Sequence, residues 1–252
     1  MKNIIEKFDK ITKTAQRSLG FKINKVEDKT PSSIIIVSTK TITKQSLNSL
    51  KKINPDALIV NAEELPKAKV QLLKDFSWGI NINSLTIDTA EKNLKNEPDF
   101  IMFGIKDSLI EPLEEGSIGR FLFVENDISE FYVKNLEDLP IDVIVTSLPN
   151  ETNITLNTLV TLANIRNYIT KYFFIESSNK LTTRELQELR EIGVDGFIFN
   201  ESIGVNEILD LKEEINKLPD KKNKSTSKNN DRISFSVENV DVETEDEDDD
   251  DD

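Results

Sequence analysis

The chain has no cysteine and no histidine among its 252 residues. Without cysteine, disulfide bonds and thiolate metal sites are excluded, so zinc, haem and iron–sulfur centres are not expected. Without histidine, the commonest general base and the commonest transition-metal ligand are missing. A metal, if the protein uses one, would be held by hard oxygen ligands, which favours Mg²⁺ over Zn²⁺.

Long apolar runs are also lacking, since no stretch of eighteen consecutive apolar residues occurs. The first residues, MKNIIEKF, carry charges inside their apolar run. Neither a membrane span nor a secretory signal is expected. We therefore expect a soluble, cytoplasmic protein, and the length is typical of one barrel-sized domain.

The net charge of −14 is concentrated at one end of the chain. Residues 238–252 account for −11 of it, segment 219–237 adds +3, and residues 1–218 carry the remaining −6. No predicted strand or helix has a basic stripe, so nucleic-acid binding by the body of the protein is not expected.

A fourfold repeat organises the body of the chain. Four apolar segments each begin with an aspartate, at Asp56, Asp99, Asp142 and Asp195, and their starts lie 43, 43 and 53 residues apart. Four further apolar runs lie between them, at 34–38, 78–82, 121–125 and 172–176. Eight short strands alternating with helical segments predict an α/β protein, an eight-stranded parallel (β/α)8 TIM barrel over residues 31–218.

The segments around the strands have their own signals. Residues 3–19 have one apolar helical face and are predicted to close the bottom of the barrel, within an N-terminal region 1–30; a partner-binding helix is the alternative. Helices are predicted after Thr41 or Thr43, from Leu65 to Phe76, and from Asp88 or Thr89. Residues 108–119 are the least regular connection. A helix from Thr182 begins with a capping box and ends at Gly193.

Beyond Pro219 the apolar periodicity stops. Residues 219–252 form a linker and an acidic tail that cannot bury enough apolar surface to offset the ordering entropy, so disorder is predicted. Residues 232–238 alternate apolar and polar side chains, and they are read either as disordered or as a short strand or docking motif.

Chemistry in such barrels lies at the carboxyl ends of the strands. The fifth residue after each repeat aspartate is small or polar, while the second and fourth are mostly bulky. Because side chains alternate along a strand, the bulky set is predicted to face the helices and the polar ends the barrel mouth. The candidate substrate-binding residues at these ends are Ser38, Asn61, Asn81, Asn83, Ser147 and Asn200.

Glu125 and Glu176 are the predicted catalytic pair, because each ends an apolar, aromatic-rich strand. Two strands apart, their carboxylates could approach within general acid–base or shared-metal distance, and a partly buried one would have its pKa raised. Alternatively, each is a solvated strand end or pairs with a neighbouring Lys or Arg. Lys106, just after the fourth strand, is predicted to form a Schiff base or to neutralise an anionic substrate.

Residues 186–204 contain the turn Gly193-Val-Asp195 and end in Ser202-Ile-Gly204. This segment resembles the closing unit of the phosphate-binding β/α barrels of tryptophan and thiamine biosynthesis. In that group a turn after the last strand opens a small helix whose amides hold phosphate. The resemblance implies that Ser202 and Gly204 stand at the phosphate position. Glu201, and Ser177-Ser-Asn-Lys in place of a Gly-Gly turn, depart from that pattern.

Two functions are compatible with these features. The first is a small-molecule-binding barrel, a lyase, isomerase or aldolase-like enzyme that acts on a small anionic or hydroxylated metabolite. The second is a non-catalytic barrel scaffold that acts through its acidic tail on a basic partner protein.

Overall fold

The computed structural model describes residues 4–16, 33–113, 118–149 and 153–218. The predicted tail at 219–252, the 232–238 motif and most of the N-terminal region up to residue 30 lie outside the described residues. The domain limits at residues 30 and 218 therefore stay predictions. In the described part of the chain, no helix has the length and apolar character needed to cross a bilayer.

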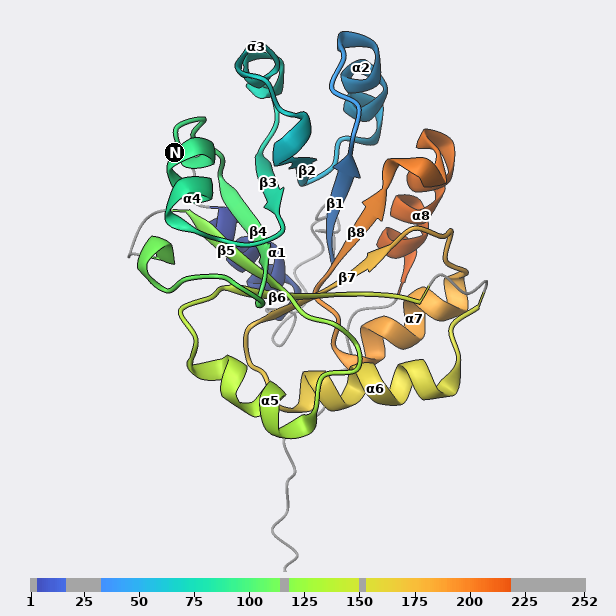
Figure 1. Ribbon diagram of the computed structural model, residues 1–252. Helices are drawn as coiled ribbons and strands as arrows, with labels where there is room; N and C mark the ends of the chain where they lie inside the picture. Colours follow the sequence, from blue (N-terminus) through green and yellow to red (C-terminus); the bar gives the residue numbers. More distant parts are fainter. Residues whose placement is uncertain (1–3, 17–32, 114–117, 150–152, 219–252) are drawn as a thin grey trace, which may run out of the picture. The chain divides into compact units, whose positions relative to one another are not determined.

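Eight parallel strands close into a barrel in sequence order, each paired with the next and β8 paired with β1 (Figure 1). The strands are β1 (Ile34–Thr39), β2 (Ala57–Asn61), β3 (Trp78–Ile82), β4 (Phe100–Gly104), β5 (Gly119–Phe123), β6 (Val143–Ser147), β7 (Tyr172–Ser177) and β8 (Gly196–Asn200). This arrangement confirms the predicted eight-stranded parallel barrel.

The α-helices surround the barrel and close its floor (Figure 1). They are α1 (Ile4–Gln16), α2 (Lys44–Ile53), α3 (Lys67–Val70), α4 (Ile87–Leu94), α5 (Glu130–Asn135), α6 (Leu156–Asn167), α7 (Thr183–Ile192) and α8 (Val205–Lys217). Short 3₁₀ turns are η1 (Ala62–Glu64), η2 (Gln71–Leu73), η3 (Glu111–Leu113), η4 (Leu136–Asp138) and η5 (Glu201–Ile203).

The helix starts follow the capping signals in most places. Thr43 and Thr182 cap α2 and α7 through their side chains, and Gly193 ends α7 in the left-handed region with φ 114°. The start of α4 differs from the prediction: Thr86 is its N-cap, with Thr89 as the reciprocal partner inside the first turn. The predicted Leu65–Phe76 helix is also wrong, because α3 covers four residues and η2 follows it.

The repeat aspartates have a structural role at the amino ends of the even strands. Each donates its backbone N–H to the carbonyl of a residue near the start of the preceding odd strand, at 2.7–2.9 Å. Its Oδ2 accepts the N–H of that same residue, at 2.8–3.1 Å. These two-bond brackets join Asp56 to Ile35, Asp99 to Trp78, Asp142 to Arg120 and Asp195 to Phe173. The fourfold repeat of the sequence therefore reflects four such brackets, each of which ties an odd-numbered strand to the even-numbered strand that follows it.

Two apolar layers follow the alternation along the strands. The outward set, which includes Leu58, Phe103 and Phe197, packs with the helices as predicted. The inward set fills the barrel, and α1 completes it from below with Ile4 and Phe8.

Aromatic rings fill the lower barrel. The Phe8 ring lies 6.0 Å from Phe121 and 5.4 Å from Phe174, between ring centroids. Lys7 of the same helix donates to the backbone oxygen of Asp56, at the amino end of β2, at 2.7 Å. The predicted floor helix is thus confirmed, and among the described residues it covers the amino end of the barrel, opposite the carboxyl ends of the strands.

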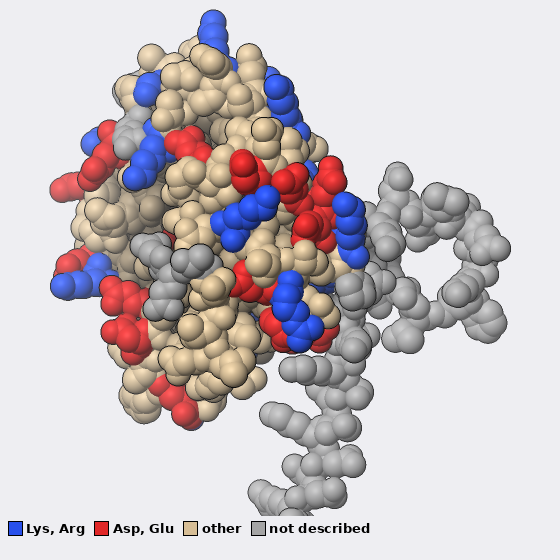
Figure 2. Space-filling model, turned by 90° about the vertical axis from the view of Figure 1, so that its right-hand side faces the viewer, with Lys and Arg blue, Asp and Glu red and all other residues tan. Residues whose placement is uncertain are grey.

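Charged side chains of both signs are interspersed on the face shown in Figure 2. Ion pairs such as Lys180–Asp210, at 3.2 Å, join the loop before α7 to α8. No continuous basic stripe crosses this face, in agreement with the sequence.

Candidate functional site

The polar strand ends form a ring at the carboxyl mouth of the barrel. The four residues placed five positions after the repeat aspartates are the last residues of the even strands: Asn61, Gly104, Ser147 and Asn200. Ser38, Asn81 and Glu176 lie in the last part of β1, β3 and β7. These positions continue the inward alternation of the core residues below them, such as Ile36, Ile59, Val145 and Phe174.

Strand register brings the ring residues together in neighbouring pairs. Ser38 lies opposite Asn200, Asn61 opposite Asn81, and Ser147 opposite Glu176. Side chains in register on one face of adjacent strands are close neighbours. These register pairs therefore place neutral hydrogen-bonding groups around one acid, Glu176.

Glu176 is the acid, and its surroundings are unusual for a carboxylate. The side chain is half-buried, and burial raises the pKa of its carboxyl above the ordinary value of 4.5. Among the described residues, no hydrogen bond or ion pair reaches this carboxylate. Desolvation without a compensating partner favours the neutral acid, which is the form that can donate a proton.

A second part of the mouth is a cavity of about 470 Å³ over the carboxyl ends of β3, β4 and β5. Three predicted residues line it together: Asn83, Lys106 and Glu125. Asp127 and Ser129 line it as well, and the sequence reasoning missed both. Their only signal was their position just after a predicted strand.

Glu125 and Glu176 are differently placed. β5 ends at Phe123, so Glu125 stands on the following loop and is exposed. Glu176 is not among the residues that line the Glu125 cavity. The predicted acid–base partnership of the two carboxylates remains untested, and their environments already distinguish them.

Asn126, next to Glu125, ties β5 to β6 at the mouth and was not anticipated. Its side-chain oxygen accepts the hydroxyl of Thr146, and its side-chain nitrogen donates to the carbonyl oxygen of Ser147. These two hydrogen bonds hold the backbone at Ser147, the register neighbour of Glu176.

The turn after β8 differs from an anion-binding site with free backbone amides. The Glu201 carboxylate accepts the backbone N–H groups of Lys40 and Thr41, at 2.8 and 3.1 Å, together with the Thr39 hydroxyl. The amide of Ser202 donates to the side-chain oxygen of Asn200 at 3.0 Å. Several donors that could hold phosphate here are therefore already engaged by this chain's own acceptors.

No cluster of three or more Asp or Glu residues with metal-ligand geometry occurs in the parts of the chain that the structure describes. Mg²⁺ binding by Glu125 and Glu176 thus has no geometric support from a wider acidic cluster. It stays a prediction.

In sequence comparisons, no family model and no curated protein matches the chain. Solved structures do match. One is 3-keto-L-gulonate-6-phosphate decarboxylase from Vibrio cholerae, with TM-score 0.59 and 11% identity over 75% of this chain and 100% of the other. Another is tryptophan synthase from M. tuberculosis, with TM-score 0.59 and 9% identity over 86% and 98%.

Thiamine phosphate pyrophosphorylase from Pyrococcus furiosus is also similar, with TM-score 0.53 and 15% identity over 74% of this chain and 95% of the other. These are the kinds of barrel that residues 186–204 resemble. At identities this low the likeness concerns the fold alone, and the chain belongs to the eight-stranded β/α (TIM) barrels.

Proposed function

We propose that the protein is an enzyme that binds a small hydroxylated or anionic metabolite at the barrel mouth and uses Glu176 for proton transfer. The observation that carries the proposal is the half-buried carboxyl of Glu176, which has no hydrogen-bond or ion-pair partner among the described residues and whose pKa is raised by burial. A raised carboxyl pKa inside a barrel mouth is typical of a general acid.

The surrounding residues suit a substrate rich in oxygen. Ser147, the register neighbour of Glu176, and the asparagines of the ring offer donors and acceptors to hydroxyl and carbonyl groups. Lys106 in the β3–β5 cavity supplies a positive charge for an anionic group. Proton transfer to or from carbon or oxygen at such a mouth supports a lyase, isomerase or aldolase-like reaction.

Two of the similar structures carry a phosphorylated compound in their names. In this chain, Glu201 occupies the amides of Lys40 and Thr41, next to the β8 turn. We therefore assign the anionic group of the substrate to the Lys106 side of the mouth rather than to Ser202 and Gly204.

A thermal-shift screen of the full chain against sugar phosphates, carboxylic acids and divalent cations would find the ligand class. A ligand at a hundred times its dissociation constant stabilises the folded state by about 2.7 kcal/mol. With a ligand found, Glu176→Gln should abolish turnover while keeping the ligand-induced shift. Full activity in Glu176→Gln would refute the catalytic assignment, and Glu125→Gln is the matched comparison at the exposed carboxylate.

The acidic run at 238–252 favours a second candidate function, a scaffold that binds a basic partner protein. Deletion of residues 219–252 separates the two. An enzyme whose chemistry lies at the barrel mouth should keep its ligand response and turnover after the deletion. A scaffold would lose partner binding while its barrel stays folded.

A further inference from the structure

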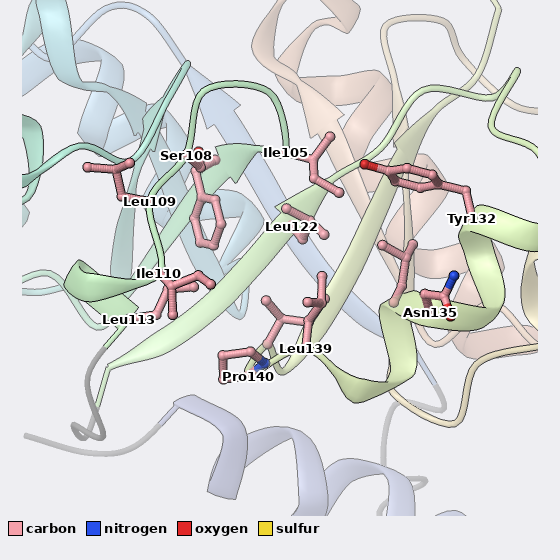
Figure 3. A pocket seen from close by; sticks show the side chains of 13 residues that line it. Ile105, Ser108, Leu109, Ile110, Leu113, Leu122, Tyr132, Asn135, Leu139 and Pro140 are labelled. Atoms are coloured by element: carbon pink, nitrogen blue, oxygen red, sulfur yellow. The ribbon is translucent and has the colours of Figure 1, made fainter.

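The outer side of β4 and β5 carries an apolar groove of about 400 Å³. Every other connection between consecutive strands contains an α-helix, whereas the described residues between β4 and β5 form only the 3₁₀ turn η3. In Figure 3, Leu122 of β5 lies centrally, with Leu109 and Ile110 on one side and Tyr132 of α5 on the other. In the part of the chain that the structure describes, the groove therefore marks the place where no α-helix covers the barrel.

Exposed apolar side chains gather around this groove instead of being scattered. The described residues include seven exposed large hydrophobic side chains, and six of them belong to the groove, to α5 or to α6. Ile110 is 79% exposed and Phe131 of α5 is 77% exposed. Three of the six, Leu109, Ile110 and Tyr132, line the groove itself. Grouped apolar side chains of this kind mark interaction sites, whereas single exposed residues do not.

Helix α6 is the second half of this surface. It packs beside α5, buries Leu162 and Ile165 against the barrel, and still exposes Leu156 (81%) and Val160 (57%) on its outer side. Residues 153–165 contain no charged side chain, in a chain in which 31% of residues are charged. The exposed side of α6 therefore combines two large apolar side chains with the neutral amides of Asn157 and Asn164, and it carries no charge as far as Ile165.

We propose that two copies of the chain associate through this face, with α6 of each copy lying in the groove of the other. Helix α5 lies between the two, since it lines the groove with Tyr132 and Asn135 and packs beside α6. A two-fold axis near α5 can bring each part against its counterpart, as an isologous contact requires. Each copy carries a net charge of −14 and repels the other. An uncharged helix face lets them meet without pairing like charges, and depletion of charge is characteristic of interface cores.

The oligomeric state of the full chain tests the association. Sedimentation velocity should give twice the 28.7 kDa of one chain. Val160→Glu and Ile110→Glu should each shift the protein to the monomer with an unchanged far-UV circular dichroism spectrum, because both side chains are exposed. Asn48→Glu, on the exposed side of α2, should leave the dimer intact. A wild-type monomer at 100 μM, or dimers that persist in both glutamate variants, would overturn the proposal.

The cysteine-free sequence allows a direct test of which surfaces meet. Ile110→Cys and Val160→Cys chains, mixed and treated with a short bismaleimide, should cross-link to each other, since any link must join two molecules. Asn48→Cys mixed with Val160→Cys should not. Efficient linking of Val160→Cys to itself, with none to Ile110→Cys, would overturn the helix-in-groove arrangement.

Discussion

Glu176 and the repeat aspartates lie at opposite ends of the barrel and in opposite surroundings. Each aspartate accepts a backbone N–H and is fully committed to holding two strands together. The Glu176 carboxyl has no such partner among the described residues, and its pKa is raised by burial. All five acids were singled out from the sequence. Their different roles could not be predicted there, because the hydrogen bonds that mark the aspartates as structural join residues far apart in the sequence.

Glu176→Gln should stabilise the folded protein at high pH and leave it unchanged at low pH. Below the ordinary carboxyl pKa of 4.5, Glu176 is neutral in both the folded and unfolded states. Above its raised folded-state pKa, the folded protein must hold a buried charge, so wild-type stability falls as pH rises through that value. Urea midpoints measured from about pH 4 to about pH 8 should diverge with rising pH. A pH-independent difference between the two proteins would contradict this account.

Removing one bracket carboxylate should cost about 1–3 kcal/mol of unfolding free energy, because it leaves a buried backbone N–H unpaired. Asp99→Ala is the suitable variant, since Asp99 accepts from both the Trp78 amide and the Ser77 hydroxyl. Asp210→Ala is the control, because its exposed ion pair with Lys180 should contribute less than about 1 kcal/mol. Chemical denaturation of both variants measures the difference, and equal losses would argue against the bracket.

At the scale of the elements, the strands followed the sequence more faithfully than the helices. Strand ends were predictable because the period of two and the repeat aspartate both fix the register. The helix at 65–76 could not be predicted correctly from periodicity, since tertiary packing decides whether a weak helical segment stays whole. Glu125 was predicted to end a strand, but β5 stops at Phe123, and Glu125 stands on the loop that follows.

Glycines in some strands leave room for an aromatic ring of the neighbouring strand. A Cβ on Gly79 of β3 would lie 2.4 Å from the Phe100 ring of β4. Gly79→Ala should therefore destabilise the barrel by about 1–3 kcal/mol through overpacking. Gly104→Ala should cost less, because its Cβ would meet a single atom, the Asn83 carbonyl oxygen, at 3.0 Å. Thermal unfolding of the two variants gives the comparison, and a larger loss in Gly104→Ala would contradict it.

Across the whole molecule, structural and candidate functional residues are divided between the two ends of the barrel. Brackets and the α1 floor hold the amino end, and the polar ring opens at the carboxyl end. The sequence predicted which strand ends meet, because strand polarity in a parallel barrel fixes this, and the binding role of the ring stays a prediction. The sequence also predicted an irregular connection at 108–119. It did not predict the groove beside that connection, because the groove depends on how β4, β5 and α5 pack together.

This division predicts that stability and binding respond to different substitutions. Asp142→Asn at the amino end should lower the melting temperature while leaving the dissociation constant of a mouth ligand unchanged. Asn81→Ala in the ring should weaken that ligand with little effect on melting, because its side chain is only partly buried. Calorimetric titration and thermal unfolding of both variants provide the measurements. Weakened binding in Asp142→Asn would show that the two ends are coupled.

The aspartate brackets also bear on how the barrel forms. Each one joins residues only 21 or 22 positions apart. Closing so short a loop costs little chain entropy, so contacts of this range form early. Four strand pairs can therefore assemble as local units before the ring closes, and we expect the joining of β8 to β1, at the opposite ends of the sequence, to be the late step.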